Sequence, residues 1–348
     1  MLAGALALLP GLIALAHYWS SGGRLPGPAP ERAAAFDAAH ENAACEDCHR
    51  EIAREWRGSQ HQTAFADPSF QRAFAVEPTA FCRGCHAPES PHIEVAPGPA
   101  TDIGVSCVSC HLRGDAVMAA PKSGFSLAPH RLEGSPAFAA AGGCSGCHQF
   151  SFGDDERREA PLAMQRTVDE HAASAHAETS CAECHMPSAG EGSLRHRSHA
   201  FASTRDPDAH RNAVEVTAAR SADGKVRFVL SLRDVGHAYP TGDLFRRVAV
   251  SAEVLGVEGR SLASRAVYLG RHFGRELDAQ GLPIRGESAD DRLGPAPTTV
   301  ELDLGSVAVG VPIEWSVELQ RVLHQNDGMA ASAVVEESLV LAEGSLPR

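Results

Sequence analysis

The chain has 348 residues, a length that allows two domains. Its formal net charge at pH 7 is −13, and a negative charge of this size argues against nucleic acid and anionic membrane surfaces as partners. All ten cysteines lie between residues 45 and 184.

The N-terminal segment, residues 1–19, has the character of an export signal. Residues 2–19 carry no formal charge, and Ala14-Leu15-Ala16 matches an A-x-A cleavage pattern, although a positive start is missing. An uncleaved N-terminal membrane anchor is the alternative, but its length is marginal for a bilayer and Pro10 interrupts it. Residues 20–39 follow as a tether rich in glycine and proline. We therefore expect export to the periplasmic or outer-surface side of a bacterial envelope.

Five copies of the pattern Cys-x-x-Cys-His dominate residues 40–211 and use all ten cysteines. This pattern is the attachment signature of c-type haem. Residues at i, i+3 and i+4 of a helical turn share one face, so both sulfurs and the imidazole can reach one porphyrin. The cysteines predicted to bind haem covalently are Cys45, Cys48, Cys82, Cys85, Cys107, Cys110, Cys144, Cys147, Cys181 and Cys184. The histidines predicted as proximal ligands of the haem iron are His49, His86, His111, His148 and His185.

Zinc sites and disulfide bridges are the alternatives for paired cysteines. Structural zinc sites usually combine two pairs, whereas this chain has an odd number of pairs, each followed by histidine. A disulfide framework would not need that histidine. We therefore predict five haem c groups, whose faces replace much of the apolar volume of a protein core. Attachment of c-type haem takes place outside the cytoplasmic membrane, in agreement with the predicted export.

Five irons would need five distal ligands, and histidines are numerous enough to supply them. Of the 18 histidines, five are proximal and His17 lies in the leader, which leaves twelve. The predicted distal ligands are His61, His130, His176, His199 and His237. The reserve candidates are His40, His92, His171, His196 and His210. We interpret His272 and His324 as packing residues. Ligation by two histidines would favour lower potentials than ligation by histidine and methionine.

Two short segments of the chain resemble each other, and we call this similarity the echo. One segment follows the first motif, and the other precedes the last motif. The segments Glu55-Trp56-Arg57-Gly58-Ser59-Gln60-His61 and Glu170-His171-Ala172-Ala173-Ser174-Ala175-His176 share their Glu, Ser and final His. The echo indicates related local roles for His61 and His176. The i, i+3 spacing of Trp56 and Ser59 predicts a helix that leads toward His61.

From about residue 212 onward, cysteine disappears and apolar residues alternate with polar ones. The pair Asp223-Gly224 separates two such runs, 214–218 and 225–233, and indicates a hairpin. Further strand-like runs cover residues 248–254, 265–269, 298–304, 313–319 and 332–341. We predict an antiparallel β-sandwich over residues 212–348, with amphipathic helices as the alternative for the final segment. The predicted fold class is α+β, a haem-packed domain of short helices and loops followed by a β-sandwich-like domain.

Three stretches of sequence carry a resemblance to a known family. The first motif is followed by Trp56-x-x-Ser59-x-His61, the last motif continues as His-Met-Pro187 with His199-x-Phe201 beyond it, and Gly236-His-x-x-Pro-Thr-Gly242 comes later. Over about residues 40–245 the chain resembles the multihaem c-type cytochromes related to the tetrahaem cytochrome of ammonia oxidation. The resemblance implies that His61 is a distal ligand of a haem other than its neighbour. Five motifs instead of four prevent transfer of the whole ligand set, and His171 is an alternative to His176.

Two different classes of function fit these features. An electron-transfer protein would relay single electrons between redox partner proteins, such as other cytochromes or a membrane quinone-linked complex. An oxidoreductase of the nitrite or hydroxylamine type would need one haem with an open face, yet all five motifs are alike. A subunit of a haem filament or conduit differs from the carrier in assembly alone. We predict the carrier, with no catalytic residues.

Overall fold

The computed structural model describes residues 32, 35–121, 128–139, 142–151, 162–201, 205–221, 223–278, 280–326 and 328–347. The predicted signal peptide or anchor and most of the predicted tether lie outside the described residues. Within the described residues, no helix is long and apolar enough to cross a membrane. The chain forms two compact units. The first contains the described residues up to 147 together with 179–205, and the second contains 148–178 and 206–348.

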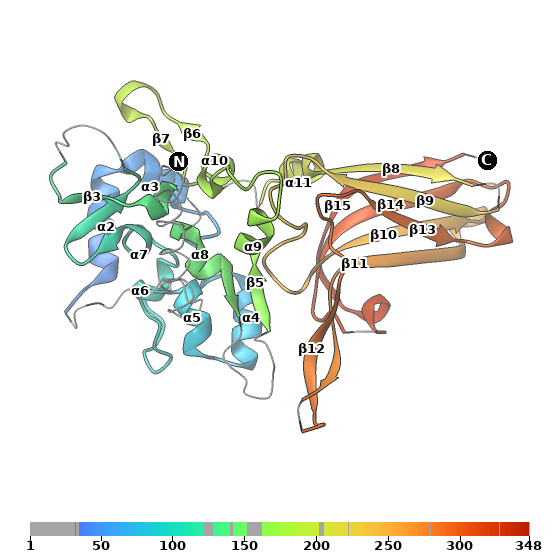
Figure 1. Ribbon diagram of the computed structural model, residues 1–348, viewed down its shortest axis with the longest axis horizontal. Helices are drawn as coiled ribbons and strands as arrows, with labels where there is room; N and C mark the ends of the chain where they lie inside the picture. Colours follow the sequence, from blue (N-terminus) through green and yellow to red (C-terminus); the bar gives the residue numbers. More distant parts are fainter. Residues whose placement is uncertain are drawn as a thin grey trace, which may run out of the picture. The chain divides into compact units, whose positions relative to one another are not determined.

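Short helices and loops build the first unit, which confirms the predicted architecture of the cysteine-rich region (Figure 1). Its α-helices are α2 (Ala38–Cys48), α3 (Arg50–Trp56), α4 (Pro68–Val76), α5 (Ala80–His86), α6 (Pro99–Asp102), α7 (Cys107–His111), α8 (Gly142–His148) and α10 (Cys181–His185). Its 3-10 helices are η1 (Pro136–Ala139) and η2 (Gly192–Leu194). Its strands are β1 (Leu112–Arg113), β2 (Ala116–Ala119), β3 (Leu132–Gly134), β6 (Ser188–Ala189) and β7 (His196–Arg197).

Each Cys-x-x-Cys-His motif lies at the end of one of these helices. Helix α2 ends at the second cysteine of its motif, and α5, α7, α8 and α10 end at the histidine. Side chains cap three of the helix starts, which fixes where the motif turn begins. The Thr79 hydroxyl accepts from the Cys82 amide, Ser106 accepts from the Ser109 amide, and the Ser180 amide donates to Glu183. The local sequence therefore presents both thiols and the imidazole from one short turn.

Two antiparallel sheets form the second unit (Figure 1). The larger has the order β12-β11-β10-β14-β15, with β12 (Pro283–Asp290), β11 (Ser261–Leu277), β10 (Arg246–Leu255), β14 (Ile313–Val322) and β15 (Val335–Leu346). The smaller has the order β13-β9-β8, with β13 (Thr298–Asp303), β9 (Lys225–Leu232) and β8 (Val214–Arg220). Alternate residues of the strands, such as Phe228 on β9 and Val250 on β10, are fully buried in one hydrophobic core. The predicted antiparallel β-domain is confirmed, and its final segment forms strand β15 rather than helices.

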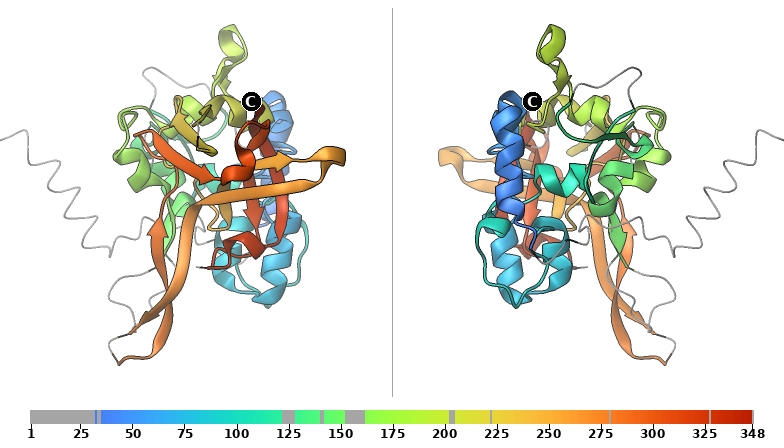
Figure 2. Two further views of the ribbon diagram at one scale, coloured as in Figure 1. Left: turned by 90° about the vertical axis from the view of Figure 1, so that its right-hand side faces the viewer. Right: turned by 90° about the vertical axis from the view of Figure 1, so that its left-hand side faces the viewer.

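Turns and one unpredicted strand complete the sandwich. Strands β8 and β9 pair as expected around Asp223-Gly224, where Gly224 has a φ of +84°. Strand β12 was not predicted, because its sequence Pro-Ile-Arg-Gly-Glu-Ser-Ala-Asp lacks apolar alternation. It pairs with the second half of the long β11, and this hairpin extends away from the sandwich (Figure 2). The remaining 3-10 helices η4 (Val257–Gly259), η5 (Ser306–Ala308) and η6 (Ala330–Ser332) lie in connections between strands.

The second unit also contains a segment that precedes the last motif in the chain. It comprises β4 (Gln149–Ser151), β5 (Ala163–Arg166) and α9 (Thr167–Ala172), and α11 (Pro207–Ala213) leads into β8. The buried Arg271 on β11 donates to the carbonyls of Ala163 and Met164 at 2.7 and 2.9 Å. The two units are therefore not separated by a single boundary at residue 211. Residues 148–178 belong to the second unit, because polar contacts attach them to its sheet.

Candidate functional site

Cysteine side chains from different motifs lie beside one another. Cys85 is a neighbour of Cys147, and Cys144 is a neighbour of Cys181. The first and third motifs are also neighbours, because the Cys107 amide donates to the buried Asn42 side chain on α2 at 2.9 Å. The attachment points therefore form two groups within the first unit, one of the second, fourth and fifth motifs and one of the first and third.

Two of the predicted proximal histidines are held by backbone carbonyls. His86 Nδ1 lies 2.9 Å from the Ala64 oxygen, and His111 Nδ1 lies 2.7 Å from the Met118 oxygen. A carbonyl only accepts, so Nδ1 carries the proton in each ring and Nε2 carries the lone pair. Metal-ligating histidines are typically oriented in this way by their second nitrogen. Burial also lowers the pKa of His111, which favours the neutral imidazole that binds a metal.

Two pairs of histidines have the separation that a shared metal ion requires. The ring centroids of His49 and His130 are 6.5 Å apart, and those of His111 and His199 are 6.1 Å apart. Since metal–imidazole bonds are about 2 Å long, two imidazoles on opposite sides of one metal ion have centroids about 6 Å apart. The residues present therefore fit an iron atom held between each pair. The structure brings His130 and His199, both predicted as distal ligands, to the predicted proximal His49 and His111.

A carboxylate on helix α3 holds the segment that carries His199. Glu55 accepts from the His199 amide at 2.9 Å and from His196 Nε2 at 3.1 Å. His199 Nδ1 in turn donates to the Arg197 carbonyl at 2.8 Å, which makes Nε2 the nitrogen that can face His111. Burial lowers the pKa of His199, as it does for His111.

In the second unit, three candidate ligands from two parts of the chain come together. A Cβ placed on Gly236 would lie 3.1 Å from atoms of both His171 and His176, so both histidines approach the loop that carries His237. His237 Nδ1 donates to the Ala238 carbonyl at 2.9 Å, and burial lowers the pKa of this histidine. The structure therefore brings His171, His176 and His237 together without selecting one of them as a ligand.

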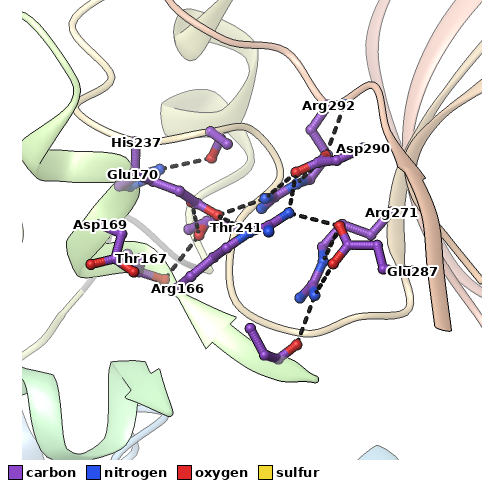
Figure 3. A network of polar contacts seen from close by, with 12 residues as sticks. Arg166, Thr167, Asp169, Glu170, His237, Thr241, Arg271, Glu287, Asp290 and Arg292 are labelled. Atoms are coloured by element: carbon purple, nitrogen blue, oxygen red, sulfur yellow. Dashed lines mark hydrogen bonds and ion pairs between the residues drawn. The ribbon is translucent and has the colours of Figure 1, made fainter. Parts of the chain in front are cut away.

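Charged residues hold this group in place (Figure 3). Glu170, beside His171, accepts from Thr241 at 2.7 Å and from the buried Arg292 at 2.6 Å. Arg166 at the end of β5 donates to Glu287 and Asp290 of β12. The network fixes α9 and the 236–242 loop on the same sheet.

Comparison with known proteins agrees with this arrangement. Residues 44–112, which contain the first three motifs, match the family model described as cytochrome c554 and c-prime. The fold is similar to that of a penta-haem cytochrome c552 from Thermochromatium tepidum, with a TM-score of 0.64, 20% sequence identity, and coverage of 88% of this chain and 98% of the other. A comparison with curated protein sequences finds no match. The family match over the first three motifs and the similar fold confirm the resemblance seen in the sequence.

The structure changes the expectation for the segment around His61. Helix α3 ends at Trp56 and does not continue toward His61, because Gly58 adopts a φ of +80° that terminates the helix. His61 lies in the following turn, and its ring contacts Phe201 edge-on with centroids 4.2 Å apart. The buried Trp56 does find the expected partner, since its Nε1 donates to the Val105 carbonyl at 2.9 Å. The role of His61 as a distal ligand stays a prediction.

The reserve candidates among the histidines have varied surroundings. His40 and His92 have side chains that are 77% and 71% exposed. His210 Nδ1 bonds the Tyr239 hydroxyl, while both ring nitrogens of His196 have acceptors at Leu194 and Glu55. Outside this set, His272 bonds Asp291, as suits the packing role assigned to it.

Two residues that support the motifs were not recognised in the sequence. Glu55 has a signal in the echo, where Glu170 occupies the matching position. Arg32 lies in the predicted tether, yet it pairs with the fully buried Glu89 and donates to the carbonyls of Val108 and Leu112 at the end of α7. A lone arginine in a glycine- and proline-rich segment gives no sequence signal for such a role.

Proposed function

We propose that the protein is a multihaem c-type cytochrome, an electron carrier that relays single electrons through five covalently bound haem c groups, mostly with two axial histidines each. Haem c, when bound, supplies a one-electron iron couple whose potential depends on ligands and burial. The observation that carries the proposal is the spacing of the two histidine pairs, His49 with His130 and His111 with His199. An iron with both axial positions filled by imidazole has no open position for a substrate.

The chain's own residues support a relay in a second way. Cysteine side chains of the second and fourth motifs, and of the fourth and fifth, lie beside each other. Attachment points in contact place the bound groups near one another, which is what transfer between them needs. The penta-haem description of the similar structure supports a count of five.

Export and redox partners belong to the same proposal. Attachment of c-type haem takes place outside the cytoplasmic membrane, so we infer a location on the periplasmic or outer-surface side. The partners would be redox proteins, such as other cytochromes or a membrane quinone-linked complex. The net charge of −13 argues against nucleic acid among them.

Mass spectrometry and electron paramagnetic resonance test the proposal together. The denatured mature polypeptide should carry the added mass of five haem groups, and the oxidised protein should show low-spin iron throughout. Fewer haem groups from a host competent in attachment would contradict the count. A high-spin signal equal to one haem per chain, together with binding of carbon monoxide, would replace the carrier with an enzyme that has an open site.

A further inference from the structure

Glu55 makes contacts that join three parts of the first unit. It lies one residue before the end of α3, where Trp56 is buried and bonded to Val105. Its side chain is only 21% exposed, and its two oxygens receive hydrogen bonds from His196 and from the backbone of His199. A carboxylate on a fixed helix end is therefore the anchor for a segment that follows the last motif.

His196 pairs with Glu55 as a cation. Its Nδ1 lies 2.8 Å from the Leu194 carbonyl, and its Nε2 lies 3.1 Å from both Glu55 oxygens. Both partners are acceptors, so only the doubly protonated imidazolium satisfies them at once. The Leu194 carbonyl, and after it Glu55, raises the pKa of His196 in agreement with this form. An imidazolium cannot bind a metal. We therefore assign His196 a structural role and retain His199 as the candidate iron ligand of this segment.

Apart from Glu55, a bond from the Ser198 amide to the Pro187 carbonyl at 2.8 Å and a short strand pair support the segment that carries His199. Strand β7, which precedes it, has two residues, and it pairs with the equally short β6. The His199 ring must nevertheless stay near His111, at the observed centroid distance of 6.1 Å. The amide bond to Glu55 acts directly on the backbone of His199, so it sets the position from which the ring projects.

We propose that Glu55 is a positioning residue that holds His199 against the iron of the third motif. This rests on the proposed function, in which His111 and His199 are the axial pair. The echoed glutamate gives a second instance of the same arrangement. Glu170 accepts from Thr241, which lies in the loop of His237, another predicted distal ligand (Figure 3). Glu55 and Glu170 thus both lie near the end of a helix, and each accepts a hydrogen bond from a later segment that carries a histidine.

The test compares Glu55→Ala, Glu55→Gln and Glu51→Ala in the full haem-loaded chain. Glu51 is the matched control, since it lies on the same helix and forms an exposed pair with Arg54. Hydrogen bonds to charged groups are strong enough that their loss changes an equilibrium about tenfold or more. We therefore expect Glu55→Ala to increase carbon monoxide binding and high-spin signal at least about tenfold, toward a limit of one haem per chain. Glu55→Gln keeps an acceptor oxygen and should restore most of the low-spin signal, while Glu51→Ala should match the wild type.

His199→Ala is measured in parallel so that two failures can be distinguished. If His199→Ala leaves all irons low-spin, the axial assignment in the proposed function is wrong. If His199→Ala opens one haem but Glu55→Ala behaves like Glu51→Ala, the positioning role of Glu55 is wrong. Covalent haem content is measured for each variant. Should Glu55→Ala fail to fold, Glu55→Met takes its place, because it keeps the length of the side chain but has no carboxylate. A Glu55→Met spectrum like that of Glu51→Ala would overturn the proposal.

Discussion

The hydrogen-bond partners of the imidazoles distinguish the proposed ligands His111 and His199 from His196. His111 and His199 each give Nδ1 to a backbone carbonyl, which leaves Nε2 with the lone pair. His196 has acceptors at both nitrogens and is held as a cation. The same residue type therefore has two roles within four positions of the chain, and the difference comes from the groups that face each ring.

The pairing of His49 with His130 can be tested by a single substitution. His130→Ala should leave all haem groups attached, because Cys45 and Cys48 remain, but should open one iron. We expect one low-spin haem per chain to become high-spin and to bind carbon monoxide, measured by electron paramagnetic resonance and optical titration. His272→Ala is the control, since this histidine is interpreted as a packing residue and bonds Asp291 at 2.9 Å. A His130→Ala spectrum identical to that of the control would remove His130 from the ligands.

Among the elements, β12 and α9 depend on charge rather than on apolar contact. Arg166 bonds Glu287 and Asp290 of β12, and Arg292 joins Asp290 to Glu170 of α9. Burial by itself would raise the pKa of Asp290, but its bonds to Arg292 and the charges of Arg292 and Arg166 lower this pKa to about 2. These elements should consequently respond to acid before the sandwich core does.

The depressed pKa of Asp290 predicts a loss of stability in acid. A lowered pKa stabilises the fold fully above the ordinary value of 3.8, and that contribution disappears as the pH falls through about 2. After allowance for partial solvent screening, the loss should be roughly 1–2 kcal/mol. Hydrogen exchange should show reduced protection of α9 amides between about pH 4 and pH 2. Asp290→Asn should remove this pH dependence, while Asp115→Asn in an exposed pair should leave it unchanged.

At the scale of the whole molecule, the formal charge of −13 governs encounters with partners. Long-range attraction to a cationic protein accelerates association, and salt screens it over a Debye length of about 8 Å at physiological ionic strength. The acidic chain therefore favours redox partners with a basic docking face.

This charge predicts the salt dependence of electron transfer. The rate of reaction with a basic redox protein should fall by about tenfold when ionic strength rises from about 10 mM to about 200 mM. Stopped-flow absorbance at the haem bands measures the rate. Reduction by a small anionic reductant should instead become faster with salt. A rate with the basic protein that does not depend on salt would show that the net charge does not steer the encounter.

The local sequence by itself determines the positions of the cysteine motifs and of most strands in the second unit. The ten cysteines and five following histidines define their own geometry within a helical turn, so the haem-binding motifs needed no tertiary information. Strands β9, β10 and β14 were also predictable from the sequence, because their alternate apolar residues must face one core. Strand β12 was not, because arginine contacts stabilise it and it has no apolar stripe.

Only the tertiary structure decided which histidines meet. His130 and His199 lie far along the chain from His49 and His111, and nothing in their local sequence encodes the partner, because loop folding sets that distance. The end of α3 at Gly58 and the attachment of residues 148–178 to the β-sheet unit also depend on contacts between distant residues. Glu55 illustrates both contributions. The echo in the sequence marks its position, but only the tertiary structure shows that it bonds the backbone of His199.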